Sequence, residues 1–382
     1  MIVQPLHTRL KDAVLLSELT WQWVASTSDL ERALLDFKHC SAVAIDTEFV
    51  RERTYYPQVA LLQISAGKTH YLIDPLSLAD LDAIRSFFQN ENILKVVHSG
   101  SEDLEVIGRW LGVEARAWFD TQIAAALLGF DQGVGFRALV QDVLGVELDK
   151  GETRSDWLKR PLSESQCFYA AADVAYLYPV FTHFEEQLKE SQRFEWVLEE
   201  GRRAAESIGS DRFDVVSRSK NAWRLSPRQV ALLSALGEMR EGIARERDKP
   251  RSWIIDDKVL FDLAQNPKAA HVILKAGGKH LLRYEDRVVA CAAEVEALPE
   301  SSLPASPEGP LTSAQRALQK RLKERITHMA SEFKVAPELV FNKKDYQYWV
   351  SEFGSGSYPT PTHWHGWREP FVRALSQEIE KS

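Results

Sequence analysis

Cysteine and long apolar runs are scarce in this sequence. The three cysteines, Cys40, Cys167 and Cys291, are too far apart to form a CxxC-type zinc or redox motif. No segment approaches about 18 consecutive apolar residues, and Pro5 and Arg9 interrupt the N-terminal segment. We therefore expect neither a membrane span nor a signal peptide, and we predict a cytoplasmic protein.

An excess of basic residues is also absent. The formal net charge is −8, whereas binding phosphate through bulk charge requires many clustered Lys and Arg side chains. Any contact with nucleic acid must therefore be made by a local group of basic residues. The formal net charge also includes carboxylates that a bound metal would neutralise. With 45% hydrophobic and 27% charged residues, the composition is that of a folded globular protein, which excludes a fibrous or broadly disordered chain.

The apolar pattern divides the chain into segments. Between residue 42 and about residue 179, short β-rich runs come first and then alternate with amphipathic helical stretches, which predicts an α/β domain with a mixed sheet. The predicted strands are AVAID, VALLQIS, HYLID and ILKVVH. Later residues are helical in pattern, and Ser226 before Pro227 predicts a helix start. We predict an α/β domain over 1–205, a helical domain over 211–298, a Pro- and Ser-rich linker over 299–311 and a second helical domain over 312–382.

Two acids follow the apolar run of the strand AVAID. Asp46 and Glu48 are two residues apart, so a strand directs both side chains to one face, where they can reach the same cation. A solvated strand end is the simpler interpretation of an isolated Asp-x-Glu triplet. Against it, acids at the end of an apolar run are costly to bury without a partner.

Two further acids occupy helical positions. Asp103 falls in the first turn of a helix after ILKVVH, where it could equally serve only to stabilise the helix N-terminus. Tyr169 and Asp173 are four residues apart in a helix and share one face, although such pairs are also common on solvated surfaces. Each of these motifs is weak evidence when taken alone.

As a set, the carboxylates Asp46, Glu48, Asp103 and Asp173 predict a site for two divalent cations, Mg²⁺ or Mn²⁺. Two ions about 3.5–4 Å apart can stabilise the attacking and leaving oxygens of a phosphodiester. Mg²⁺ takes oxygen ligands, commonly a few carboxylates and the substrate phosphate. Tyr169 could then orient or deprotonate the attacking water.

The order and spacing of these motifs resemble the tyrosine-containing branch of the DEDD exonuclease superfamily, and within it the ribonuclease D family. The resemblance is carried by DTEFVRERTYYPQVALLQIS, VVHSGSEDLEV, FDTQIAAALLG, KGETRSDWLKRPL and YAAADVAYL. The stretch beginning LSPRQVALLSALGEMREG resembles the HRDC domain, and the last unit, with ELVFNKKDY and GWREPF, resembles a second, divergent copy. The resemblance implies a ribonuclease H-like nuclease domain, metal binding by the four acids and positioning of water by Tyr169.

The resemblance also implies the reaction. Members of the family are 3′→5′ exoribonucleases that release nucleoside 5′-monophosphates from RNA with a free single-stranded 3′ end, including tRNA precursors; we expect a monomer. Bases of a single strand stack on aromatic side chains, although a partly packed loop is an equal interpretation of this segment. The substrate-binding candidates are Phe49, Tyr55 and Tyr56 for stacking, Arg51 and Arg53 for phosphate, and His98.

A basic run between Arg212 and Arg251, with Trp223 and Trp253 interleaved, is a second candidate for contact with RNA. Solvated or domain-packing charges give the same pattern.

Three other functions stay open at this level. A DNA-directed exonuclease of the same superfamily would carry the same acids, and a non-catalytic RNA-binding scaffold could retain the fold. A glycosidase could use Asp46 and Glu48 as its acid and base, but that reaction leaves Asp103 and the Tyr169–Asp173 pair without a role.

Overall fold

The computed structural model divides the chain into two compact units. The first comprises Met1–Val50, Gln58–Ile208 and Ser313–Ser382, and the second comprises Arg51–Pro57 and Gly209–Thr312. The structure describes residues 19–149, 151–152, 154–207, 214–352 and 364–380. Within this part of the chain, every helix is too short or too polar to span a bilayer.

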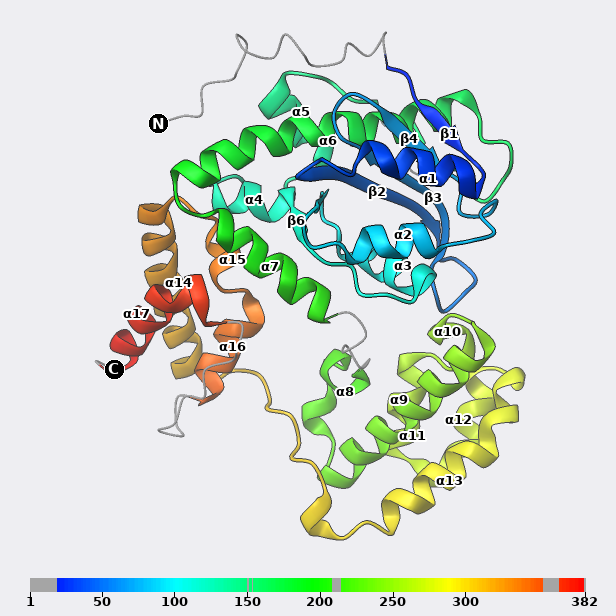
Figure 1. The fold of residues 1–382 in the computed structure, drawn as a ribbon. Helices are drawn as coiled ribbons and strands as arrows, with labels where there is room; N and C mark the ends of the chain where they lie inside the picture. Colours follow the sequence, from blue (N-terminus) through cyan, green and yellow to red (C-terminus); the bar gives the residue numbers. More distant parts are fainter. Residues whose placement is uncertain (1–18, 150, 153, 208–213, 353–363, 381–382) are drawn as a thin grey trace. The chain divides into compact units, whose positions relative to one another are not determined.

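A mixed sheet forms the centre of the first unit (Figure 1). Its strands lie in the order β1-β4-β3-β2-β5-β6; β3 is antiparallel to β2 and β4, and the other neighbours are parallel. The predicted mixed sheet is therefore confirmed. β1 and β6 were not predicted, because three residues are too few to show a periodic pattern. The strands are β1 Gln22–Val24, β2 Ala42–Val50, β3 Gln58–Ser65, β4 His70–Ile73, β5 Leu94–Val97 and β6 Trp118–Asp120.

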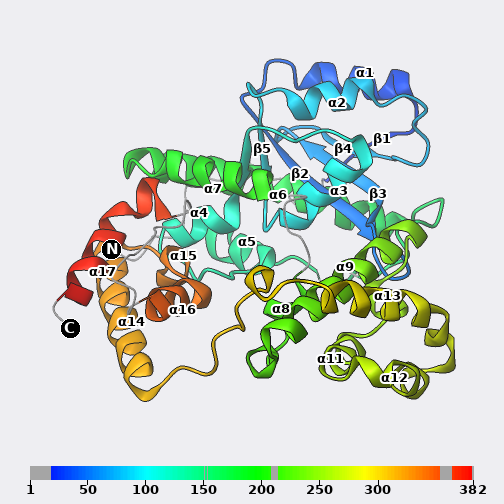
Figure 2. The same cartoon turned by 90° about the horizontal axis from the view of Figure 1, so that it is seen from below.

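Helices cover both faces of this sheet (Figures 1 and 2). On one face, α1, α2 and α3 pack on apolar side chains that include Val43 and Ile45 of β2. On the other face lies α6, whose buried Ala170 and Ala171 allow its backbone to approach the strands closely. The helices are α1 Thr27–Asp36, α2 Asp82–Gln89, α3 Ser101–Leu111, α4 Thr121–Leu127, α5 Phe136–Leu144, α6 Glu164–Glu190 and α7 Phe194–Ser207.

The second unit is helical. Its longest helix, α9, begins with the predicted Ser226–Pro227 pair, and Ser226 forms a capping box with Gln229. Tyr55, from the short segment 51–57, is part of its hydrophobic core. The predicted start at residue 211 lies outside the described residues. The helices are α8 Val215–Arg218, η2 Ala222–Arg224, α9 Pro227–Arg247, α10 Arg251–Ile254, α11 Asp257–Gln265, η3 Pro267–Ala269, α12 Ala270–Gly277, η4 Lys279–Tyr284, α13 Glu285–Glu296 and η5 Glu300–Ser302.

The C-terminal helices belong to the same compact unit as the sheet, and the second helical domain expected over 312–382 stays a prediction. The amide of Ala336 donates to the carbonyl of Ala126 at 2.8 Å. The indole of Trp367 stacks on that of Trp196, with ring centroids 5.3 Å apart. The sequence does not indicate which surface these rings cover. The helices are α14 Ser313–Phe333, α15 Pro337–Val340, α16 Lys343–Glu352, η7 Gly366–Arg368 and α17 Glu369–Glu380.

Candidate active site

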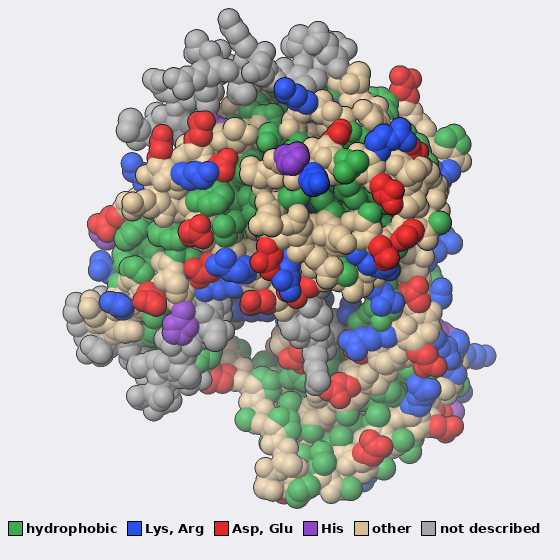
Figure 3. Space-filling model, viewed as in Figure 1, with side chains coloured by type: hydrophobic (Ala, Val, Ile, Leu, Met, Phe, Trp, Pro, Cys, Tyr) green, Lys and Arg blue, Asp and Glu red, His purple; other side chains and the backbone are tan. Residues whose placement is uncertain are grey.

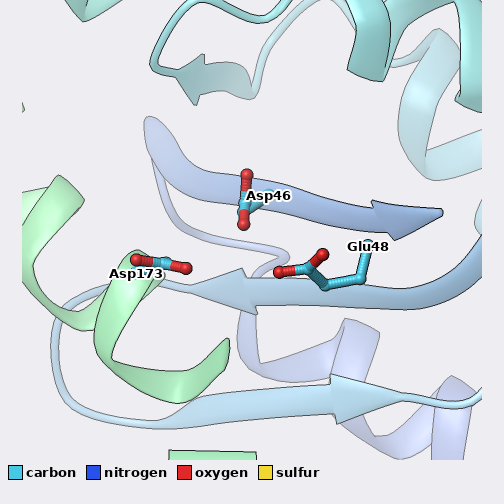
Figure 4. Close-up of side chains that lie close together, drawn as sticks. All are labelled: Asp46, Glu48 and Asp173. Carbon is cyan, nitrogen blue, oxygen red and sulfur yellow. The ribbon is translucent and has the colours of Figure 1, made fainter. Parts of the chain in front are cut away.

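Asp46 and Glu48 lie on β2, on the face of the sheet that α6 covers. Strand alternation places their side chains together, as predicted, and the pairing with β3 shifts register immediately after Glu48. Asp173 reaches the same place from α6. Carboxylate oxygens of these three residues lie within 4.8 Å of one another, and Figure 4 shows the side chains directed toward a common point. Two elements far apart in sequence therefore supply one acidic cluster.

Tyr169 lies one helical turn before Asp173. Its hydroxyl donates a hydrogen bond to the Asp173 carboxylate, and its ring centroid is 6.1 Å from that of Trp157. The predicted pair is therefore directed at the cluster and is not an isolated surface pair.

Asp103 is held at a different place from the other three acids. It lies in the first turn of α3, where its Oδ1 accepts hydrogen bonds from the Thr47 amide at 3.1 Å and from the Thr47 hydroxyl at 2.5 Å. Thr47 lies between Asp46 and Glu48 in sequence, so this contact ties α3 to the strand that carries them. The structure thus brings three of the four predicted metal ligands into one cluster and anchors the fourth beside it.

Burial and mutual repulsion dominate the electrostatics of the site. Burial, followed by the charges of Asp103, Asp173 and Glu48, raises the pKa of Asp46 well above its usual range. Burial together with the charges of Asp173 and Asp103 raises the pKa of Glu48 to about 9. Burial raises the pKa of Asp173 to about 7 and that of Asp103 to about 6, although hydrogen bonds from Tyr169 and Thr47 oppose these two shifts. The cluster needs cations to hold all its carboxylates ionised at neutral pH.

The raised pKa values predict how the stability of the metal-free protein depends on pH. Each acid binds its proton more tightly in the folded state than in the unfolded chain, where its pKa is about 4. This contribution to stability is present below about pH 4 and is lost as the pH rises through the folded-state values. In EDTA, we expect the unfolding temperature to fall by about 5 °C or more between pH 6 and pH 9.

Mg²⁺ should oppose that fall, because it binds the ionised folded state in preference to the unfolded chain. The measurement is thermal unfolding across this pH range, with EDTA and with Mg²⁺, and Asp173→Asn should weaken the dependence. Equal slopes with and without Mg²⁺ would contradict the interpretation.

Two of the predicted substrate-binding residues have other roles, so these predictions are corrected. Tyr55 is only 8% exposed, and its hydroxyl donates to Glu241 at 2.8 Å, so its ring packs in the second unit and is not available to stack on a base. The ring nitrogens of His98 both lie 3.0 Å from protein oxygens, Nδ1 from the Thr121 hydroxyl and Nε2 from the Val134 carbonyl. His98 therefore connects segments of the fold.

The other four candidates keep some accessible surface. Phe49 is half-buried at the end of β2, and Tyr56 is half-buried with its ring edge-on to that of Tyr55. Arg53 is exposed, as is Arg51, whose Nε donates to the Tyr55 carbonyl at 3.2 Å. Their binding of substrate stays a prediction.

The basic run of the second unit is partly structural. Arg240 is buried and its Nη1 lies 2.5 Å from Asp257, while Arg251 pairs with Glu241, also at 2.5 Å. Arg212 lies outside the described residues. On the face of the sheet-containing unit seen in Figure 3, basic and acidic side chains are interspersed, so that face has no continuous basic surface.

Asp120 is a positioning residue that the sequence analysis missed. It caps α4, and its carboxylate also accepts hydrogen bonds from the amides of Ser99 and Gly100 at 3.0 Å. These contacts fix the turn that leads into α3 and therefore the place of Asp103. Asp followed by a helical stretch is a visible capping signal, but the partners across the chain are not visible in sequence.

The fold and the carboxylate cluster define a 3′→5′ exonuclease domain that binds divalent metal. A family model described as "3'-5' exonuclease" matches residues 21–189, and an HRDC domain model matches residues 229–280. The chain belongs to the ribonuclease D family and is a hydrolytic 3′→5′ exoribonuclease.

The relatives cover most of the chain. Ribonuclease D of Pseudomonas paraeruginosa is 34% identical over 94% of this chain and 98% of its own length. Ribonuclease D of Escherichia coli is 35% identical over 79% of this chain and 82% of its own. The crystal structure of the Escherichia coli enzyme, an exoribonuclease involved in structured RNA processing, superposes with a TM-score of 0.84 and 30% identity, covering 95% of this chain and 99% of that one.

Proposed function

We propose that this enzyme trims the 3′ ends of structured RNAs, tRNA precursors among them, with two divalent ions, Mg²⁺ or Mn²⁺, at the cluster. The observation that carries the proposal is the convergence of carboxylate oxygens from Asp46, Glu48 and Asp173 within 4.8 Å. The processing of structured RNA stated for the Escherichia coli relative supports the substrate class. A monomer and a cytoplasmic location are part of the same proposal.

The donor set fits hard divalent ions. All the converging ligand atoms are carboxylate oxygens, which Mg²⁺ and Mn²⁺ prefer over softer ions such as Zn²⁺. The acids repel one another and are half-buried, so a bound cation removes an electrostatic cost that the metal-free site carries. This fit also disfavours a glycosidase, which requires only two carboxyl groups.

Each residue has a separate role in the proposed reaction. Asp46, Glu48 and Asp173 would hold a divalent ion, and Asp103, fixed by Thr47, would supply a further carboxylate beside the cluster. When bound, the two ions supply the charge that stabilises the attacking and leaving oxygens of the phosphodiester.

Tyr169 is assigned to orient the attacking water. Burial and the charges of Asp173, Glu48 and Asp46 raise the pKa of its hydroxyl above the usual range, so the phenol stays neutral at physiological pH. A neutral phenol can donate and accept hydrogen bonds but is a poor base. Orientation is therefore favoured over deprotonation, two roles that the sequence left open.

RNA contacts outside the cluster are assigned to side chains that keep accessible surface. The candidates that follow the first motif in sequence are the half-buried Phe49 and Tyr56 and the exposed Arg51 and Arg53. In the second unit, the guanidinium carbon of Arg224 lies 4.9 Å from the ring centroid of the partly exposed Trp223, a pair suited to contacts with the RNA backbone and bases.

We also interpret the helices over 312–382 as a second HRDC-like unit.

Digestion of a tRNA precursor with a 3′ extension tests this function. With Mg²⁺ and 5′-labelled RNA, we expect products that shorten one nucleotide at a time and release nucleoside 5′-monophosphates. Matched controls are the same RNA with a blocked 3′ end, a DNA of the same sequence, and EDTA followed by added Mg²⁺ or Mn²⁺. Preference for the DNA would overturn the substrate class, and activity that survives EDTA would overturn the metal assignment.

A further inference from the structure

Gln63 lies on β3 directly opposite Asp46 of β2 in the antiparallel pair. Directly paired residues on neighbouring strands project to the same face, with Cβ atoms about 5 Å apart. The alternation along β3 agrees, because Leu62 and Ile64 belong to the core under α1, α2 and α3, which leaves Gln63 on the face of α6 and the acidic cluster. The side chain of Gln63 therefore starts from the strand position opposite Asp46, on the face that carries the acidic cluster.

The side chain of Gln63 is fully buried. Neither its amide nitrogen nor its amide oxygen has a hydrogen-bond partner among the described residues. Buried amides are costly when unpaired, and folded proteins rarely leave both atoms of one unsatisfied. On the same face of β3, the apolar Leu61 fills its position without polar atoms, and buried Ser65 has a partner in His70 at 2.8 Å. Packing therefore does not account for a glutamine at position 63.

We propose that Gln63 is a positioning residue of the ion-loaded site. Its Nε2 donates to the Asp46 carboxylate, and its Oε1 accepts from a water that enters with the divalent ion. Mg²⁺ usually retains several of its waters in protein sites, and these waters need acceptors. Residues that hydrogen-bond to a metal ligand without touching the metal orient that ligand and influence the affinity for metal. The inference rests on the proposed divalent site at Asp46, Glu48 and Asp173.

Gln63→Met tests it, because methionine keeps the length of the side chain without its amide. We expect the variant to unfold at a temperature a few degrees higher than the unmodified protein in EDTA, since an unsatisfied buried group is removed. We also expect the Mg²⁺ concentration that gives half of the maximal rise in unfolding temperature to increase about 10-fold or more. Neither readout depends on activity. Gln58→Met, at an exposed position of the same strand, is the matched control and should change neither readout.

Unchanged Mg²⁺ dependence in Gln63→Met would overturn the inference, because the amide would then have no part in the loaded site. A lower unfolding temperature in EDTA would also overturn it, because the amide would then have a partner in the metal-free protein. Gln63→Leu provides the same comparison if the methionine variant does not fold. If the unmodified protein shows no rise with Mg²⁺, the proposed metal site itself fails, so the two failures are distinguishable.

Discussion

Asp173→Asn is expected to lower the rate of nucleotide release from RNA by at least about 10³-fold. Asp173 is the one member of the three-carboxylate cluster that comes from α6, so its substitution leaves only the two carboxylates of β2 in that cluster. Asparagine has the same shape and no charge, so it should retain the packing of α6 while weakening the hold on the cation. The measurement is kcat on a single-stranded RNA at saturating Mg²⁺.

The same substitution should leave the metal-free protein at least as stable as before. Asp173 raises the pKa of both Asp46 and Glu48 through its charge, so removing it relieves repulsion inside the cluster. This separates a chemical defect from a folding defect, because activity falls while the unfolding temperature in EDTA does not. Glu190→Gln, at an exposed position of the same helix, is the matched control and should retain full activity. Near-normal turnover by Asp173→Asn would remove this carboxylate from the mechanism.

The parts of the site that were predicted from sequence are those that depend on local geometry. The period of two in a strand gave the shared face of Asp46 and Glu48, and the spacing of four in a helix gave that of Tyr169 and Asp173. These rules need no knowledge of the tertiary fold. The meeting of the two pairs was inferred from their chemistry as a set and from a family resemblance.

The parts that were missed depend on which segments meet. Thr47 points away from Asp46 on the strand, and nothing in the local pattern indicates that α3 brings Asp103 to it. Tyr55 follows the first motif closely in sequence but lies in the core of the helical unit, because residues 51–57 belong to that unit. Sequence proximity to a catalytic motif was therefore misleading here.

Tyr169→Phe is expected to lower kcat by about 10²-fold or more while leaving the dependence on Mg²⁺ nearly unchanged. The hydroxyl is not a member of the carboxylate cluster, so its removal should leave the ion-binding oxygens of Asp46, Glu48 and Asp173 in place. It does donate to Asp173, and one hydrogen bond within the site is lost. A phenyl ring keeps the packing against Trp157, so a folding defect is not expected.

The measurement that distinguishes these effects is kcat as a function of Mg²⁺ concentration. A lower maximal kcat with an unchanged Mg²⁺ midpoint indicates that Tyr169 acts on the attacking water. A shifted Mg²⁺ midpoint with an unchanged maximal kcat would mean that Tyr169 supports Asp173, and would contradict the role proposed here. Tyr178→Phe is the matched control, because it removes a phenol from the same helix outside the acidic cluster.

The pH dependence of the rate distinguishes the two chemical roles of Tyr169. Since the raised pKa of Tyr169 keeps its hydroxyl neutral, Tyr169→Phe should lose the same fraction of the rate at pH 7 and at pH 8. A loss that grows with pH would instead indicate that the phenolate is the base.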